Sequence, residues 1–157
     1  LNEQEALGYL LAAGNPKEPE IPIAVNKDDI IFSYYLIKTN SRISSKLEDG
    51  KPKFTIRIKT DGMIHEAKVS RLRSEMQPIL EKAIEERVIE IVLETIGKAK
   101  KYNADIFGLY EHFHRYHPRN WNKIEPNWRE CFQDAEIEVE VDAKIRSFGT
   151  SNEGFNF

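Results

Sequence analysis

The amino-acid sequence predicts an α+β fold: an antiparallel or mixed sheet of about four strands, with one long helix and shorter helices packed on one face. Apolar and polar residues alternate strictly over residues 53–59 and 136–146, the pattern of half-buried strands. Between them, residues 74–102 carry a continuous apolar stripe at helical spacing. Strands joined by short turns and followed by helices favour this class over a doubly wound sheet.

Composition restricts the chain to an ordinary globular class. Its 157 residues are 40% hydrophobic and 31% charged, which suits one domain with a sizeable core. The net charge of −3 gives no positive field, so nucleic-acid binding is not expected. A single cysteine, Cys131, excludes an internal disulfide and a multi-cysteine zinc module. No run of 18 apolar residues is present, so we expect no transmembrane helix.

The first part of the chain is expected to be peripheral. Residues 1–14 favour a short helix that ends at Gly14. The prolines of residues 15–22 favour an extended connector. Because the sequence opens on Leu1, we expect it to be a piece of a longer protein. We therefore divide the single domain, 1–157, into a connector with a short helix (1–28), a core (29–147) and a flexible tail (148–157).

Two Asp-Gly pairs divide the region of predicted strands. Residues 29–39 favour a first strand, and Asp49-Gly50 supplies the positive-φ turn of a hairpin. The strand at 53–59 follows, with a basic outer face. Asp61-Gly62 then predicts a second hairpin turn, which leads to a short strand at 63–67.

The long helix and the last strand complete the predicted core. Ser74 and Gln77 have capping-box spacing at the start of the helix. The outer face of 136–146 is mostly acidic, so this strand would pair well beside the basic face of 53–59.

The stretch from Ala104 to Phe132, here called the aromatic stretch, concentrates the side chains that carry chemistry. It holds both tryptophans, three of the four histidines and the cysteine. On a helix, His112 would point about 160° away from His114, so His112, His114 and His117 would converge on a metal only from an irregular backbone. The alternative is exposed histidines around a partly buried Phe113 and Tyr116.

Other catalytic patterns are weak. A nucleophilic Cys131–His pair would need a partner and an orienting acid that spacing cannot establish, and a small buried thiol beside Phe132 is the simpler interpretation. Asp105 is placed to cap the next helix. The sequence has no glycine-rich phosphate loop, no G-x-S-x-G and no H-E-x-x-H. We therefore expect no catalytic residue, metal or cofactor.

The aromatic stretch contains an unusual pattern made of Asp105, Ile106, Phe107, Gly108, Pro118, Trp121, Asn127, Trp128 and Phe132. This pattern resembles the C-terminal domain of the Ger(x)C family, the lipoprotein C subunits of bacterial spore germinant receptors. Nearly the whole chain agrees with the resemblance, including Gly50-Lys51-Pro52-Lys53 and Leu80-Glu81-Lys82.

The resemblance implies a non-catalytic subunit of a receptor that triggers germination when nutrients are sensed. Its implied partners are the receptor's A and B subunits. Its implied location is the outer face of the spore inner membrane, held by a lipid anchor upstream of this chain.

Within such a receptor we expect a docking module. Pro126 breaks any helix between Trp121 and Trp128, so both rings would pack from a turn onto the core. Two alternatives remain, a module whose aromatic stretch lines a nutrient pocket and a metal-dependent enzyme that uses the histidines. The candidate interaction surface comprises Arg115, Arg119 and Lys123.

Overall fold

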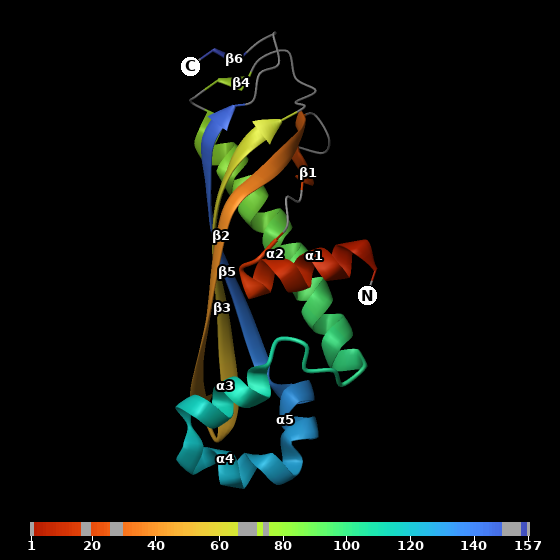
Figure 1. Ribbon diagram of the computed structural model, residues 1–157, viewed down its shortest axis with the longest axis vertical. Coiled ribbons are helices and arrows are strands. Elements are labelled where there is room, and N and C mark those ends of the chain that lie inside the picture. Colours follow the sequence, from red (N-terminus) through yellow and green to blue (C-terminus); the bar gives the residue numbers. More distant parts are fainter. Residues whose placement is uncertain are drawn as a thin grey trace.

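A computed structural model of the protein describes residues 2–16, 20–25, 30–65, 72–73, 76–148 and 155–156 (Figure 1). The helices are α1 (Glu3–Ala13), α2 (Gln77–Lys101), α3 (Leu109–Tyr116), α4 (Pro118–Ile124), the 3₁₀ turn η2 (Glu125–Asn127) and α5 (Trp128–Asp134). The strands are β1 (Glu20–Val25), β2 (Ile30–Glu48), β3 (Lys51–His65), β4 (Leu72–Arg73), β5 (Glu136–Phe148) and β6 (Phe155–Asn156).

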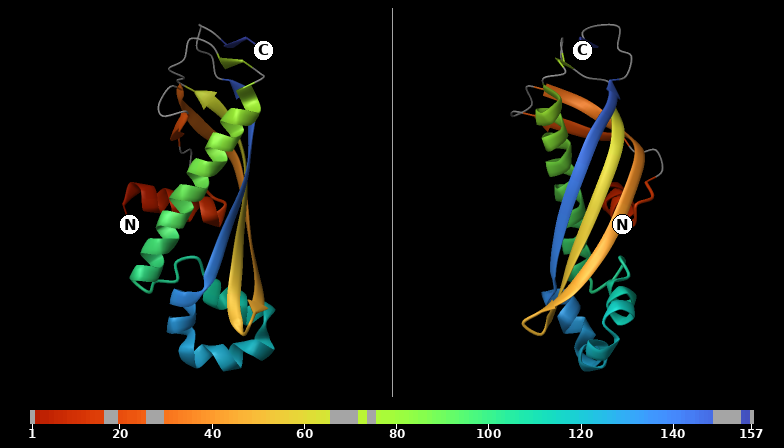
Figure 2. Two further views of the ribbon diagram at one scale, coloured as in Figure 1. Left: turned by 180° about the vertical axis from the view of Figure 1, so that it is seen from behind. Right: turned by 90° about the vertical axis from the view of Figure 1, so that its left-hand side faces the viewer.

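The core is a four-stranded mixed sheet in the order β1-β2-β3-β5, which confirms the predicted α+β class. β1, β2 and β3 are antiparallel, whereas β5 runs parallel to β3. α2 crosses one face of this long, twisted sheet, and α1 crosses α2 (Figure 1). α3, α4 and α5 lie at the end of the sheet where β2 turns into β3. No described helix covers the opposite face (Figure 2).

The first Asp-Gly pair forms the predicted hairpin turn. Asp49 and Gly50 both have positive φ, at 53° and 76°, as a two-residue turn between twisted strands requires. β2 and β3 therefore form one long hairpin.

The second Asp-Gly pair is not a turn, and this prediction was wrong. Asp61 and Gly62 lie inside β3, opposite Lys38 and Leu36 of β2. A Cβ on Gly62 would lie 2.5 Å from the ring of Tyr34, so the glycine makes room for a neighbouring aromatic side chain. The expected strand at 63–67 is the end of β3 as far as residue 65, and residues 66–67 lie outside the described residues.

Tyr34 links three strands from within the core. Its hydroxyl accepts a hydrogen bond from Thr60 Oγ1 at 2.9 Å and donates one to the Lys144 carbonyl at 3.0 Å. Burial raises the pKa of Tyr34 to about 12, so the hydroxyl stays protonated and keeps both bonds at any ordinary pH.

The expected connector contains a strand that the sequence prediction missed. Residues 20–25 form β1, in which Ile21, Ile23 and Val25 point into the core. Pro22 lacks an N–H but is tolerated because β1 is an edge strand. Of the predicted flexible tail, residues 155–156 form β6 beside β4, and residues 149–154 and 157 lie outside the described residues.

The basic face of β3 lies beside the acidic face of β5, which confirms the prediction that these strands are neighbours. Lys53 lies opposite Glu136, and Arg57 lies opposite Glu140. Lys53 Nζ is 3.0 Å from Glu138 Oε1, and Arg57 Nε is 2.8 Å from Glu140 Oε2. These pairs are solvent-accessible, so they add little to stability and chiefly favour this register.

α1 and α2 meet where α1 has no side chain. A Cβ on Gly8 would overlap Thr95 Oγ1, which donates a hydrogen bond to the Ile91 carbonyl at 3.0 Å. α1 is capped as predicted at Gly14, whose φ is +72°. For α2, the predicted cap at Ser74 lies outside the described residues.

Gly8→Ala should destabilise the fold because the added methyl group would push α1 away from Thr95. We expect a loss of about 1–3 kcal/mol in the free energy of unfolding, measured with denaturant. Gly97→Ala on α2 is the matched control, since nothing lies within 4 Å of its Cβ position. That change should raise stability by up to about 1 kcal/mol. Equal effects at both sites would contradict this account of the helix crossing.

Candidate functional site

Helices α3, α4 and α5, with the turn η2, form a cap on the end of the sheet, here called the aromatic cap (Figure 1). The cap has a core of its own beside the main core of the sheet and α2. Its buried members come from the cap, from β3 and from the end of α2. They are Phe54, Ala99, Leu109, Phe113, Trp121, Ile124, Phe132 and Ala135.

The cap begins at a backbone turn held by Asp105. One carboxylate oxygen accepts a hydrogen bond from the Leu109 N–H at 2.9 Å, and the other accepts one from Tyr110 N–H at 2.7 Å. Asp105 therefore caps α3, as its position in the sequence predicted. Gly108 has φ +70°, a conformation that favours glycine. Ile106 and Phe107, between them, are half-buried against the cap's core.

Aromatic rings fill the interior of the cap. Trp121 is 2% exposed, and the edge of Tyr110 meets it at a ring-centroid distance of 4.4 Å. The ring centroid of Trp128 lies 5.6 Å from that of Trp121 and 6.2 Å from that of Phe132. Edge-to-face and offset rings attract through their quadrupoles, so the cluster is a packed structure.

The other members of the recognised pattern define the helix boundaries. Pro118 is the first residue of α4, where its missing N–H has no cost. Asn127 ends η2, directly before α5. Pro126 lies within η2, so it separates the helices that carry the two tryptophans.

Two of the histidines bind the sheet, which corrects the expectation that they are exposed. His112 Nε2 is 3.0 Å from the Ile43 carbonyl, and His117 Nε2 is 3.1 Å from the Ser45 carbonyl. These carbonyls belong to the part of β2 that β1 does not reach. His114 is exposed and packs beside Trp121. Spacing along the sequence carries no signal of contacts with a strand so far away.

No group of three or more histidine, cysteine or acidic side chains that could hold a metal occurs within the described residues. Cys131 is half-buried rather than fully buried, beside Phe132. Burial, together with Asp134 and Glu130, raises the pKa of its thiol. A raised pKa leaves less thiolate at neutral pH, the opposite of what a catalytic nucleophile needs.

The predicted interaction surface lies on the outside of the cap. Arg115 is exposed on α3, and Arg119 and Lys123 are exposed one turn apart on α4. Within the described part of the chain, none of the three forms an ion pair. Tyr116 and Tyr110 add partly exposed rings, at 62% and 37%. The cap thus combines a packed interior with an exterior of exposed charged and aromatic side chains.

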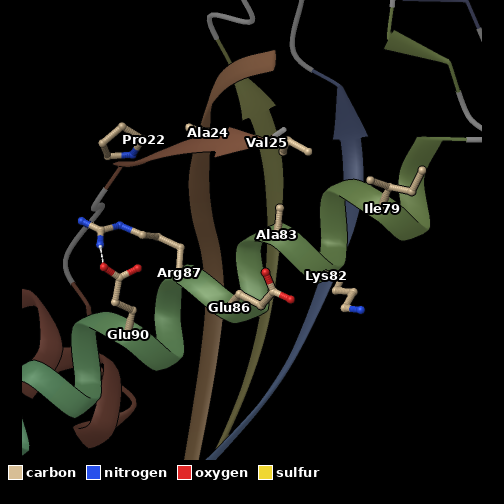
Figure 3. Close-up of a pocket in the computed structure, with 9 residues that line it drawn as sticks. All are labelled: Pro22, Ala24, Val25, Ile79, Lys82, Ala83, Glu86, Arg87 and Glu90. Carbon is tan, nitrogen blue, oxygen red and sulfur yellow. Dashed lines mark ion pairs between the residues drawn. The ribbon is translucent and has the colours of Figure 1, made fainter. Parts of the chain in front are cut away.

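The larger hollows lie elsewhere, beside the edge strand β1. One of about 560 Å³ opens between β1 and α2 (Figure 3). A second of about 600 Å³ lies between α1, β1 and α2. Both include Arg87, whose Nη1 is 3.1 Å from Glu90 Oε1 (Figure 3). No ring of the aromatic stretch lines either hollow.

Each helix in the described ranges is too short or too polar to cross a lipid bilayer.

Comparisons with known proteins agree on one family. The family described as "Spore germination B3/GerAC like, C-terminal" matches residues 1–149. Spore germination protein B3 of Bacillus subtilis (strain 168) is 29% identical over 126 residues, which cover 76% of this chain and 33% of that protein. Spore germination protein YndF of the same organism is 29% identical over 153 residues, 96% of this chain and 38% of that protein. The chain thus spans about a third of the length of these relatives.

A solved structure shares the fold. The crystal structure of the GerBC protein matches 93% of this chain and 46% of its own, with a TM-score of 0.82 and 24% sequence identity. At that identity the likeness supports the arrangement of strands and helices alone.

The burial of His112 against the sheet should make stability depend on pH. Burial lowers the pKa of His112 below its usual value, against a smaller opposing effect of the bond to Ile43. Its stabilising contribution is therefore present above the unfolded pKa of about 6.5 and is lost as pH falls below it. The buried Nδ1 of His112 has no hydrogen-bond partner among the described residues, so a proton there would have no acceptor.

We expect His112→Gln, which keeps a donor for the Ile43 carbonyl, to flatten the fall in unfolding free energy between pH 7.5 and 5.5. Denaturant titrations at several pH values measure this. His114→Gln is the matched control at an exposed histidine of the same helix and should keep the wild-type dependence. If His112→Gln leaves that dependence unchanged, the role given to His112 is wrong.

Proposed function

Because the chain belongs to the family of C-terminal domains of spore germination B3/GerAC-like proteins, we propose that it serves spore germination as part of a germinant receptor C subunit. Within that subunit it acts as a non-catalytic docking module. The family match over residues 1–149 supports the receptor role. The names of the relatives, which are spore germination proteins, support it as well.

The observation that carries the docking role is the contrast between the inside and the outside of the aromatic cap. Inside, buried rings pack the three short helices together, and Asp105 accepts hydrogen bonds from the start of α3. His112 and His117 bind the cap to β2. Outside, the cap presents Arg119, Lys123 and exposed tyrosines, and arginine and tyrosine are enriched at protein interfaces. A surface held rigid before binding loses little conformational entropy when a partner docks.

The proposed partners are the other receptor subunits, A and B. In this proposal the receptor lies at the outer face of the spore inner membrane. A lipid anchor in the part of the subunit upstream of this chain attaches it there. No cofactor or nucleic acid takes part.

A small-ligand role is the second candidate, and the hollows beside β1 favour it. Their volumes, about 560 and 600 Å³, fall in the range of small-molecule sites, roughly 300–1,000 Å³. A thermal-shift screen with amino acids and sugars tests it. A ligand at 100 times its dissociation constant adds about 2.7 kcal/mol to stability. No shift with any of them would remove this candidate.

A histidine-based metal enzyme is the weakest candidate, since two of the three histidines already bind β2. Calorimetric titration with zinc should give no heat of binding. Heat that disappears in His114→Ala would revive the metal site.

The docking role predicts that the double variant Arg119→Ala, Lys123→Ala slows nutrient-triggered germination. Both side chains are exposed, so unfolding free energy should change by no more than about 0.5 kcal/mol. The test introduces the variant into the full-length subunit and follows the germination of spores.

The matched control is Lys38→Ala, Lys59→Ala, which removes two exposed lysines from the open face of the sheet. Spores with the control should germinate normally. Normal germination with the cap variant, or equal delay with both, would count against docking through this surface.

A further inference from the structure

Side chains from the helices bind some of the backbone groups that the sheet leaves unpaired. On β2, His112 and His117 bind two of the carbonyls that β1 leaves uncovered, those of Ile43 and Ser45. On β5, the Ala143 N–H donates to Glu85 Oε2 at 2.9 Å, and the Ile145 N–H donates to Glu81 Oε2 at 2.8 Å. Gln77 donates to the Ile145 carbonyl at 3.0 Å. α2 therefore closes the edge of β5 at residues 143–145.

The same edge of β5 is open at residues 137–141. Alternate residues of a strand direct their N–H and C=O to the same edge, so Ile137, Val139 and Val141 face the same way as Ala143 and Ile145. None of the hydrogen bonds among described residues closes this edge at 137–141. The stretch pairs regularly with residues 54–58 of β3, without a bulge. β1 also has a free edge, but Pro22 removes a donor from it.

The open stretch lies between two different surfaces. On the open face of the sheet lies a row of acids, Glu136, Glu138, Glu140 and Asp142. α2 lies on the other side. Glu81, Glu85, Ile89 and Leu93 follow one another on this helix at four-residue steps, so they form one row along it. Ile89 is half-buried, and Leu93 is 45% exposed. A strand laid along β5 would have acids beside one face and an apolar shelf beneath the other.

We propose that residues 137–141 of β5 receive an extended segment of a partner protein in which basic and apolar residues alternate. The segment would add a fifth strand to the sheet, with main-chain hydrogen bonds to Ile137, Val139 and Val141. Its cations would face the acidic row, and its apolar side chains would rest on Leu93. Three acids, Glu136, Glu138 and Glu140, face Lys53 and Arg57, so these two cations neutralise this part of the row only in part. The fourth acid, Asp142, lies opposite Lys59 and 3.6 Å from Lys144 Nζ.

Charge disfavours a second copy of this chain as the occupant. Pairing two β5 edges would put the acidic row of one copy beside that of the other, and like charges across a strand pair are destabilising. The surface is also distinct from the aromatic cap, so it stands independently of the proposed docking role.

The test uses a seven-residue peptide of alternating lysine and valine, titrated into the ¹⁵N-labelled 157-residue chain. We expect chemical-shift changes and slower amide hydrogen exchange concentrated at residues 137–141, with affinity falling as salt rises. A peptide of alternating glutamate and valine should not bind. Shifts centred on β1, or equal binding of the two peptides, would overturn the proposal.

Two variants separate strand addition from general attraction. Val139→Pro removes an outward N–H on an edge strand, where proline is tolerated, and should abolish binding. Leu93→Asp should weaken binding about tenfold or more by removing the apolar shelf. Ile79→Asp, at a 54% exposed position of the same helix, is the matched control and should have no effect.

Binding that survives both Val139→Pro and Leu93→Asp would refute the site. So would a dimer of the chain, seen by analytical ultracentrifugation, that Val139→Pro dissociates.

Discussion

β3 and β5 lie parallel in the sheet, and the path that this pairing demands determines most of the remaining structure. β3 ends at His65, at the far end of the sheet, whereas β5 must begin beside Lys53. The 15 residues of β3 span roughly 50 Å, and the 25 residues of α2 return roughly 37 Å of that distance. The chain between α2 and β5 must therefore travel beyond the end of the helix, around the end of the sheet. That segment is the aromatic cap.

The cap has to be well packed because it covers the end of a core. Phe54 on β3 and Ala99 on α2 would be exposed without it, and both are buried among its rings. Short helices are marginal on their own, so the tertiary contacts of Trp121 and the hydrogen bonds of Asp105 and His112 hold them. At residues 43–45 of β2 and 143–145 of β5, side chains from a helix take the place of a missing strand. The aromatic stretch, which first suggested a site, is in this account structural on the inside and available to partners on the outside.

The sequence predicted what local patterns determine. Alternation revealed β5 and its acidic face, and Asp49-Gly50 revealed the hairpin. The same dipeptide at Asp61-Gly62 gave a wrong prediction. Its glycine is needed to make room for the ring of Tyr34, which is far away in the sequence, and not to form a turn. β1 was missed because nearby prolines hid a strand that the main core stabilises. The contacts of the histidines with β2 join residues about 70 positions apart, beyond any local pattern. The recognised family pattern located the cap but not the contacts of its exterior.

Amide hydrogen exchange of the Trp121→Ala variant tests most directly whether the cap holds the end of the sheet. Removing a buried tryptophan should cost about 3–5 kcal/mol. We expect amide protection to fall in the cap and also at Phe54–Ile56 and Ile137–Val139. β1 and the part of β2 that pairs with it should keep their protection. Loss of protection confined to α3, α4 and α5, with the lower ends of β3 and β5 unchanged, would contradict the account.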